Sequence, residues 1–293
     1  MSYPSIAVFG GDARQKWLAH TLEAQNLLSA VYAVPDYQPS SPHVTVLEHP
    51  AQLSQYACLA GPVPFCREEQ LVLPYTAAPM SLSSFLAFLQ PGQCVAGGNF
   101  PASFIAQCHD KQIEIYDYMH SSSLTLANAV LTAEGMLAVL LTQTPYALQQ
   151  ASILLLGYGR CGMLLAQKLQ ALGCRVTVCE KDTFRRSLAD AQGFTTLTPE
   201  ELPASLPAHR LVVNTVPELL LTAPLLQLFP ADAQLFDLAS APGGIAQEAA
   251  KKQGLFVQSC PGLPGRTAPQ TAGQKLAADL LSHLQIVALP QKG

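Results

Sequence analysis

The sequence has few charged residues. Only 12% of its 293 residues are Asp, Glu, Lys or Arg, against 49% hydrophobic residues, and the net charge of −4 comes without any run of Lys or Arg. Nucleic-acid and anionic-membrane binding need clustered positive charge, so this balance argues against both and favours small-molecule chemistry. The apolar excess is high for a soluble monomer, so we expect buried surface between the protomers of a homo-oligomer.

Paired cysteines and long apolar runs are also missing. The eight cysteines include no C-x-x-C pair, which is typical of reduced, buried thiols rather than of a disulfide framework. No uninterrupted apolar run approaches the ~20 residues of a membrane span. The N-terminus "MSYPSIAVFGGD" has neither a basic flank nor a cleavable apolar core. We therefore expect a cytoplasmic protein without a membrane segment, and no metal-ligand cluster or Ser-His-Asp arrangement is visible.

What the sequence does contain is strand and helix patterns in alternation. Its length exceeds the usual size of one domain, and the alternation predicts an α/β protein with two doubly wound parallel-sheet domains. We expect a flavodoxin-like, substrate-binding domain over 1–122, to which a C-terminal helix at 271–293 returns. A Rossmann domain over 123–270 begins with an apolar bridging helix at 123–141.

The predicted elements follow from the apolar periodicity and the turn residues. A strand at 6–9, the turn Gly10–Gly11 and an apolar helix face at Trp17, Leu18 and Leu22 make a β-turn-α start. Further strands of the first domain are predicted at 57–60, 70–73, 93–98 and 113–118, with helices at 81–89 and 101–110. The second domain has five predicted strands, at 152–156, 174–179, 210–213, 234–238 and 255–258, with helices at 160–172, 183–192, 223–228 and 245–253.

The stretch "SILLLGYGRCG" indicates a dinucleotide site. Gly157 permits a tight turn, Gly159 lets the backbone approach a pyrophosphate, and Gly162 allows the helix to pack closely on the strand. The N-terminus of the following helix offers unpaired N–H groups and partial positive charge to phosphates. A second strand then ends at Glu180, 18 residues after Gly162, which is the expected distance to a ribose-binding carboxylate.

The residues around Glu180 give two signals about the coenzyme. A carboxylate there accepts hydrogen bonds from the ribose hydroxyls and favours NAD, whereas Lys181, Arg185 and Arg186 could meet the 2′-phosphate of NADP. Both interpretations stay open.

Two polar turns follow later strands of the same domain, "NTVP" at 214–217 and "DLAS" at 237–240. Ligands of open α/β sheets lie beyond the carboxyl ends of the strands, so these turns are expected to face the nicotinamide half. The predicted cofactor-binding residues are Gly157, Tyr158, Gly159, Arg160, Cys161, Gly162, Glu180, Lys181, Asp182, Arg185, Asn214, Thr215, Val216, Pro217, Asp237, Leu238, Ala239 and Ser240.

Six motifs together resemble the family of dipicolinate synthase A subunits. They are "GGDARQ" (10–15), "TAEG" (132–135), "LGYGRCG" (156–162), "NTVP" (214–217), "DLASAPGG" (237–244) and "PGLPGRTAPQTAG" (261–273). The resemblance implies a fold like that of the formate/glycerate dehydrogenases, a nicotinamide cofactor that is usually NADP, with NAD as the alternative, and a flavoprotein-like partner, the dipicolinate synthase B subunit. It also implies oxidation of a dihydrodipicolinate-type dicarboxylate to dipicolinate, in the sporulation branch of the lysine pathway. Glu180 differs from what this resemblance implies, because a carboxylate at that position disfavours the 2′-phosphate of NADP.

A dicarboxylate substrate calls for arginine, whose planar fork binds carboxylates with two hydrogen bonds. Arg14 and Arg266 lie in glycine-rich loops, one in each domain, and we expect each to bind one carboxylate in an interdomain cleft. Asp12 either orients Arg14 or caps the first helix. The substrate-binding residues predicted with the resemblance are Asp12, Arg14, Gln15, Thr132, Arg266 and Gln270.

Removal of a hydride to the nicotinamide leaves a proton to be taken up. Glu134, a carboxylate in an apolar helix, is one candidate acceptor, and His120 is another, with Asp117 as a competitor at the same strand end. Two other functions fit the residues: a nicotinamide-binding regulatory or scaffold subunit whose partner performs the chemistry, and an alanine or shikimate dehydrogenase-like oxidoreductase.

Overall fold

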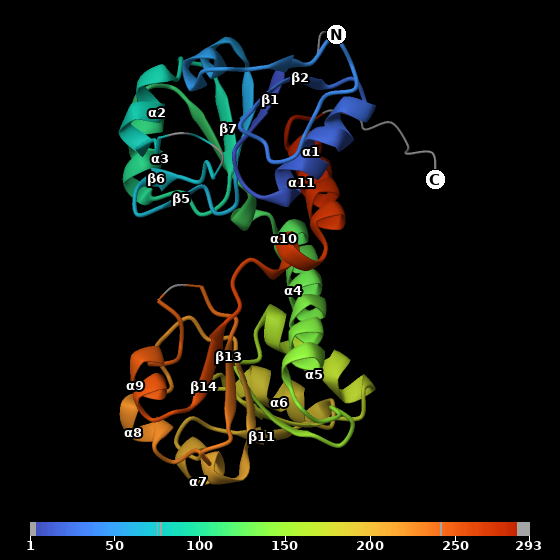
Figure 1. Ribbon diagram of the computed structural model, residues 1–293, viewed down its shortest axis with the longest axis vertical. Coiled ribbons are helices and arrows are strands. Elements are labelled where there is room, and N and C mark those ends of the chain that lie inside the picture. Colours follow the sequence, from blue (N-terminus) through green and yellow to red (C-terminus); the bar gives the residue numbers. More distant parts are fainter. Residues whose placement is uncertain (1–3, 75, 77, 241, 286–293) are drawn as a thin grey trace. The chain divides into compact units, whose positions relative to one another are not determined.

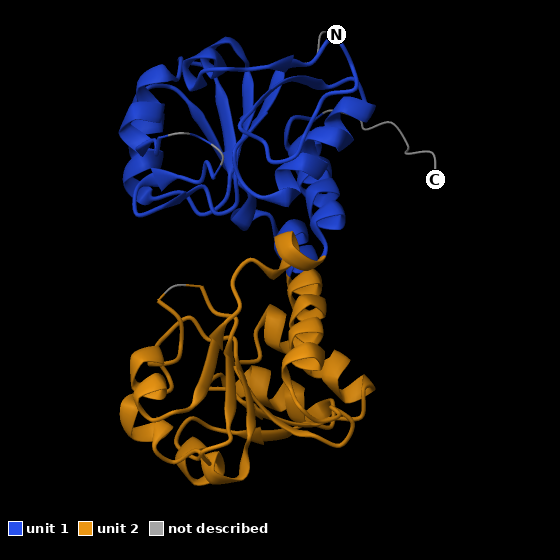
Figure 2. Cartoon of the chain, in the orientation of Figure 1, with its two compact units in different colours: residues 1–128, 268–293 blue, residues 129–267 orange. Residues whose placement is uncertain are grey.

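The computed structural model describes residues 4–74, 76, 78–240 and 242–285 (Figure 1). Its contacts divide the chain into two compact units, residues 1–128 with 268–293 and residues 129–267 (Figure 2). The division falls inside helix α4 (Ser122–Gln143), six residues after the boundary we expected. The reason is packing, because α4 gives Leu124 to the core of the first unit and Met136 and Leu140 to the core of the second.

The first unit is built on six parallel strands in the order β3-β2-β1-β4-β7-β8. Without the exposed, two-residue edge strand β3, this is the flavodoxin order 2-1-3-4-5. The strands are β1 (Ile6–Phe9), β2 (Leu28–Tyr32), β3 (Thr45–Val46), β4 (Cys58–Ala60), β7 (Cys94–Gly97) and β8 (Glu114–Asp117), and the helices are α1 (Ala13–Ala24), α2 (Leu82–Phe88), α3 (Ala102–Asp110) and α11 (Pro269–His283), with 3-10 turns η1 (Pro50–Gln55) and η2 (Tyr118–His120).

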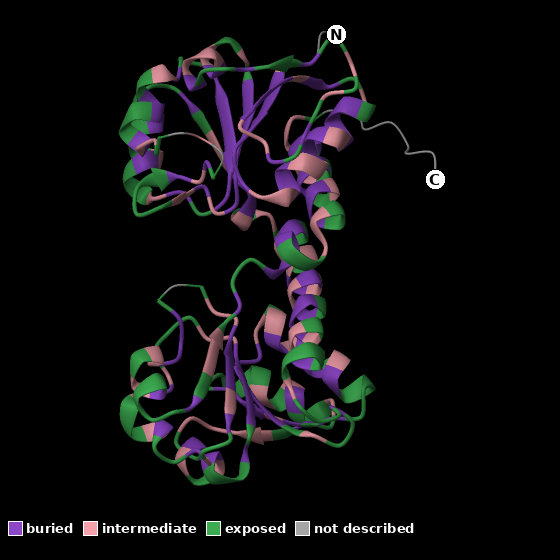
Figure 3. Ribbon diagram, viewed as in Figure 1, coloured by how far each residue is buried: buried purple, intermediate pink, exposed green. Residues whose placement is uncertain are grey.

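Helices cover both faces of this sheet (Figure 3). Ile6 and Val8 pack with α1 and α11, while the alternate residues Ala7 and Phe9 pack with α2 and α3, as the two-residue period of a strand requires. The C-terminal helix therefore belongs to the core of the first unit. Its predicted continuation over 286–293 lies outside the described residues.

Four strands of the first unit differ from the prediction. The strand predicted at 70–73 is wrong as part of the main sheet, because β6 (Gln70–Leu71) pairs antiparallel with β5 (Cys66–Arg67) in a separate ribbon. The next carbonyl, of Val72, instead accepts a hydrogen bond from the Gly11 N–H at 2.8 Å. The strands β2, β3 and β5 were not predicted. The turn before β2 is made by Asn26 with a φ of 58°, so no Gly or Pro marks the end of the preceding helix.

The second unit has six parallel strands in the order β11-β10-β9-β12-β13-β14, the Rossmann order, so the predicted five are one too few. The missed strand is the three-residue edge strand β11. The strands are β9 (Ser152–Leu156), β10 (Arg175–Cys179), β11 (Thr195–Leu197), β12 (Leu211–Asn214), β13 (Gln234–Asp237) and β14 (Phe256–Ser259), and the helices are α5 (Arg160–Ala171), α6 (Thr183–Ala191), α7 (Leu202–Ser205), α8 (Ala223–Leu226), α9 (Gln247–Lys252) and α10 (Leu263–Thr267), with the 3-10 turn η3 (Leu206–Ala208).

Helix α4 is long and apolar enough to cross a membrane by length and composition alone, with a mean hydropathy of 1.8. Its apolar run is interrupted by polar residues, which is why the sequence contains no unbroken span. Ala133, Met136 and Leu140 on one face are buried in the core of the second unit, and Glu134 on another face forms an ion pair with Lys168. Core packing therefore accounts for the apolar character of this face.

Candidate functional site

The glycine turn after β9 is fixed by close packing. Gly157 has a φ of 91°, and a Cβ there would lie 2.6 Å from Thr215 Oγ1. A Cβ on Gly162 would overlap the carbonyl oxygen of Gly157. The protein itself therefore requires glycine at both positions, whatever binds at the turn.

Gly159 is different, because a Cβ there would have no atom within 4 Å. Gly159 is the N-cap of α5, and it has no side chain that could accept a hydrogen bond from the first backbone N–H groups of this helix. Gly159 lines a cavity of about 400 Å³ in the second unit. Open space at an uncapped helix N-terminus is what a bound phosphate group needs.

The cavity lies beyond the carboxyl ends of β9, β10 and β12, where the strand order reverses around β9. A parallel sheet of this type binds its ligands at such a switch point. The predicted cofactor-binding residues that line the cavity are Gly157, Gly159, Arg160, Cys161, Glu180, Lys181, Arg185, Thr215, Val216 and Pro217. The lining residues not predicted are Cys179, Pro199, Glu218, Leu219 and Leu220; the last three simply continue the "NTVP" turn.

Glu180 is buried at the edge of the cavity and connects two loops. Its Oε2 accepts a hydrogen bond from the Tyr158 N–H at 2.7 Å, and its Oε1 accepts one from the Asp182 N–H at 2.9 Å. The carboxylate therefore holds the glycine turn against the end of β10. Each oxygen keeps a second lone pair for a further donor such as a ribose hydroxyl.

The cations after Glu180 have separate surroundings. Lys181 forms an exposed ion pair with Glu218 at 3.2 Å, and both residues line the cavity. Arg185 is exposed, whereas Arg186 donates to the Glu180 carbonyl at 3.0 Å. Lys181 and Arg185 thus bring positive charge to the cavity wall. Asp182 caps α6 by accepting from the Arg185 N–H at 2.8 Å.

Asn214 and Asp237 form a buried pair at the ends of β12 and β13. The Asn214 Nδ2 donates to Asp237 Oδ1 at 2.7 Å and to the Val216 carbonyl at 2.9 Å. Asp237 also accepts from the Ala239 N–H at 3.1 Å and from the Gly244 N–H at 3.0 Å. These side chains hold the two turns rather than line the cavity. Tyr158, Gly162, Asp182, Leu238, Ala239 and Ser240 also lie outside its lining, and their contact with a coenzyme stays a prediction.

Comparison with known proteins finds dipicolinate synthase A subunits along nearly the whole chain. The model of the N-terminal domain of the dipicolinate synthase A subunit matches residues 5–119. The A subunit of dipicolinate synthase from Bacillus subtilis (strain 168) is 27% identical over 96% of each chain. A solved structure of the dipicolinate synthase A chain from Bacillus subtilis superposes with a TM-score of 0.83 and 25% identity, over 97% of this chain and 98% of that one. The chain thus resembles the dipicolinate synthase A subunits over nearly its whole length.

Other solved structures bear on the fold. The dipicolinate synthase A subunit from Bacillus halodurans gives a TM-score of 0.87 at 24% identity, over 96% of this chain and 98% of that one. A phosphoglycerate oxidoreductase from Vibrio cholerae gives 0.59 at 12% identity, over 96% of this chain and 99% of that one. The predicted fold class of two parallel-sheet α/β domains, like that of the formate/glycerate dehydrogenases, is therefore confirmed.

In this chain, the "GGDARQ" motif makes a tight network at the start of α1. Asp12 accepts from the Arg14 N–H at 3.0 Å and caps the helix, while its carboxylate also accepts from Arg14 Nε at 2.9 Å and Nη2 at 2.8 Å. Arg14 is buried, and its Nη2 also donates to the Val63 carbonyl. Gln15, fully buried, binds the Asp12 N–H and the Gly61 carbonyl. Asp12 thus both caps the helix and orients Arg14.

The candidate proton acceptors differ in their exposure and in the hydrogen bonds and ion pairs that they form. Glu134 is exposed and lies 3.0 Å from Lys168 Nζ. Buried Asp117 accepts from three backbone N–H groups, of Asn99 and Phe100 at 3.2 Å and of Met119 at 2.8 Å, so its carboxylate holds a loop. His120 is exposed in η2.

The remaining predicted substrate residues lie on α4 and around α10. Thr132 is partly buried on α4, whereas Arg266 and Gln270 are exposed. No hydrogen bond or ion pair engages the Arg266 guanidinium within the described part of the chain. Its donors are therefore available to a ligand.

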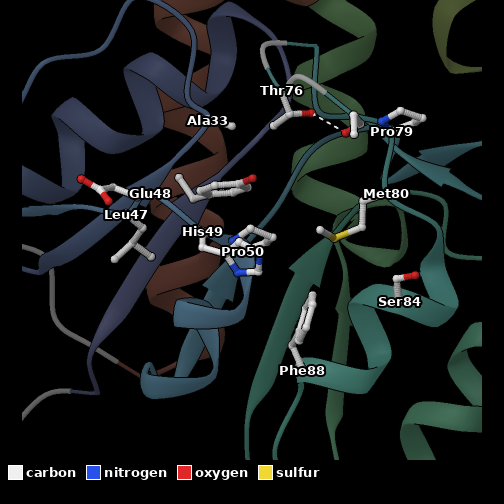
Figure 4. A pocket seen from close by; sticks show the side chains of 12 residues that line it. Ala33, Leu47, Glu48, His49, Pro50, Thr76, Pro79, Met80, Ser84 and Phe88 are labelled. Carbon is white, nitrogen blue, oxygen red and sulfur yellow. Dashed lines mark hydrogen bonds between the residues drawn. The ribbon is translucent and has the colours of Figure 1, made fainter.

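A second cavity, of about 640 Å³, lies in the first unit (Figure 4). Figure 4 shows Leu47, His49, Met80 and Phe88 around it, with Glu48 at one side. None of the described residues that line this cavity is Lys or Arg. The cavity therefore offers a bound anion no charge-assisted hydrogen bond from a permanently charged side chain.

The glycine turn of the first unit leaves no space for a ligand, because a Cβ on Gly10 would lie 2.6 Å from the Leu73 side chain.

Proposed function

We propose that the chain is the dehydrogenase-type subunit of a dipicolinate synthase and oxidises a dihydrodipicolinate-type cyclic dicarboxylate to dipicolinate with a nicotinamide dinucleotide. The observation that carries the proposal is the open space above Gly159, at the uncapped start of α5 and inside the cavity bounded by Glu180 and Lys181. The resemblance to dipicolinate synthase A subunits supports the choice of substrate.

The residues present fit a dinucleotide. The α5 N-terminus and the space at Gly159 suit the pyrophosphate, and Glu180 suits an adenosine ribose. When bound, the nicotinamide would accept a hydride from the ring. Loss of that hydride and of one proton converts a dihydropyridine dicarboxylate to the aromatic product, so no other oxidant is needed.

We propose NADP as the coenzyme, with NAD as the alternative. Lys181 and Arg185 lie where an adenosine 2′-phosphate would find positive charge. Glu180 opposes this choice because its carboxylate repels a phosphate, although its two backbone hydrogen bonds hold it toward the glycine turn.

Replacing Lys181 by Ala is expected to weaken NADP⁺ binding by roughly fivefold, about 1 kcal/mol, and to change NAD⁺ binding little, since only NADP⁺ carries the 2′-phosphate. Titration calorimetry of both coenzymes measures this. Glu218→Gln is the matched control, because it breaks the same ion pair but keeps the cation, and should not weaken NADP⁺. Equal losses of NAD⁺ and NADP⁺ in Lys181→Ala would contradict the assignment.

For the substrate, we propose that Arg266 binds a carboxylate through its unengaged guanidinium. We propose that Arg14 also binds a carboxylate and is held in position by Asp12. Gln15, Thr132 and Gln270 are proposed as further substrate contacts. Because Arg14 is already bonded to Asp12 and Val63, its truncation also removes contacts of the fold. Arg266 is therefore the cleaner test.

Arg266→Ala is expected to lower kcat/KM for the dicarboxylate about 30-fold, roughly 2 kcal/mol, because a charge-assisted pair of hydrogen bonds is lost. Arg266→Lys should recover only part, since an ammonium cannot reproduce the planar fork. Steady-state kinetics and coenzyme titrations measure both. Arg210→Ala, which removes an exposed arginine of the same unit, should leave kcat/KM unchanged. Wild-type efficiency in Arg266→Ala would show that the carboxylate binds elsewhere.

One observation favours a second function, a nicotinamide-binding subunit whose partner completes the reaction. Both carboxylates considered as proton acceptors already have partners. Glu134 forms an ion pair with Lys168, and Asp117 accepts hydrogen bonds from backbone N–H groups.

The deciding assay incubates the purified chain with NADP⁺ and enzymatically generated dihydrodipicolinate, with and without the dipicolinate synthase B subunit. NADPH absorbance together with the ultraviolet spectrum of dipicolinate supports the first proposal if the chain acts alone. Turnover only with the B subunit supports the second.

A further inference from the structure

We propose a zinc-binding site in the first unit, formed by the thiol of Cys94, the carboxylate of Glu114 and the imidazole of His283. One potential ligand atom of each residue lies within 4.8 Å of the others. The residues come from β7, β8 and the last turn of α11, so no local spacing in the sequence marks the site. It lies in a different unit from the dinucleotide cavity and does not depend on the proposed function.

The sheet and the C-terminal helix place the three groups together. Cys94 and Glu114 are direct register partners on neighbouring parallel strands, so their side chains lie on the same face. His283 Nε2 lies 3.0 Å from Glu114 Oε1, and its ring stacks on Tyr116 with centroids 3.8 Å apart. The imidazole is thereby held in one orientation before any ion arrives.

The ligand types select the ion. A thiolate, an imidazole and a carboxylate are the three ligand classes of protein zinc sites, whereas Mg²⁺ and Ca²⁺ prefer oxygen ligands alone. Cys94 is buried, while Glu114 and His283 remain partly exposed, which leaves a path for entry. Binding requires the Cys94 thiol to release its proton to solvent, and a water molecule completes four ligands.

A second observation comes from Tyr118. Its hydroxyl is buried and has no hydrogen-bond partner among the described residues. Tyr118 belongs to the same buried core cluster as Cys58 and Cys94. A metal-bound thiolate is an acceptor for such a donor, and outer hydrogen bonds of this kind are typical around zinc ligands.

Full-length chain, treated with a chelator and a thiol reductant, is titrated with Co²⁺ as a spectroscopic probe and then with Zn²⁺. We expect one Co²⁺ per chain, with a thiolate-to-cobalt charge-transfer band and the visible bands of a tetrahedral site, and displacement by Zn²⁺. Cys94→Ser should abolish the charge-transfer band. His283→Gln should weaken Co²⁺ at least about tenfold, and Zn²⁺ should raise the thermal midpoint of the wild type but not of His283→Gln.

The controls are Cys66→Ser and His109→Gln, which change a thiol and an imidazole of the same unit outside the cluster and should bind Co²⁺ like the wild type. Absence of stoichiometric binding in the wild type would overturn the site, as would an unchanged charge-transfer band in Cys94→Ser. If Cys94→Ser fails to fold, His283→Gln and Glu114→Gln carry the test, since both positions are partly exposed. Wild-type Co²⁺ affinity in both variants would equally overturn the proposal.

Discussion

Gly159→Val is expected to abolish binding of NAD(H) and NADP(H) to a chain that still folds. The backbone at Gly159 has an ordinary φ of −75°, and a Cβ would have no protein atom within 4 Å, so the native structure accepts a side chain. A β-branched side chain would instead fill the space assigned to the pyrophosphate. Calorimetric titration measures the affinity, and the expected loss is at least about 100-fold, or ~3 kcal/mol.

Gly162→Val is the contrasting variant, because its Cβ would overlap the Gly157 carbonyl and should destabilise the second unit as well as abolish binding. Circular dichroism and thermal unfolding separate the two effects. A folded Gly159→Val with wild-type coenzyme affinity would remove the basis for the dinucleotide assignment.

The second large effect is expected from Asp237→Ala, which should lower the free energy of unfolding of the second unit by about 3–5 kcal/mol. Asp237 is buried, and its removal leaves the Ala239 and Gly244 N–H groups without an acceptor and deprives Asn214 of one partner. Thermal unfolding followed by calorimetry measures the loss. The transition affected should be the one that a bound coenzyme raises in the wild type.

Asp232→Ala is the matched control. Asp232 is an exposed aspartate of the same unit whose ion pair with Arg210 is open to solvent, so the expected cost is below about 1 kcal/mol. An Asp237→Ala variant as stable as Asp232→Ala would mean that the buried network contributes nothing measurable to holding the two turns.

Most of the second unit was predictable because its signals are local. The predicted strand at 152–156 and the predicted helices agree closely with β9, α5 and α6, since apolar runs and glycine turns fix such elements within a few residues. Edge strands such as β3 and β11 were missed because they are two or three residues long and partly or fully exposed, so burial leaves no pattern in them.

The candidate site shows the same limit. The glycine turn and Glu180 were predictable from their spacing in the sequence. The hydrogen-bond partners of the polar side chains were not, because they depend on which strands lie side by side. Asn214 and Asp237 are predicted to face a coenzyme, and this stays a prediction. Their pairing with each other follows from the register of β12 and β13, which the sequence does not reveal. Arg14 was expected to bind a carboxylate, with Asp12 either orienting it or capping the helix. Val63, far away in the sequence, supplies a further acceptor that no local pattern indicates.

The first unit is discontinuous, and this has a consequence for synthesis of the chain. Residues 129–267 are contiguous and can fold as soon as they leave the ribosome. The core of the first unit includes Leu276, Leu280 and Leu281 of α11, which is translated last. Until then, residues 1–128 cannot complete this core, and the apolar surface that α11 covers stays exposed to solvent. Although N-terminal domains usually fold first during translation, here the order is expected to be reversed, with the nascent first segment exposed to chaperones for nearly the whole period of synthesis.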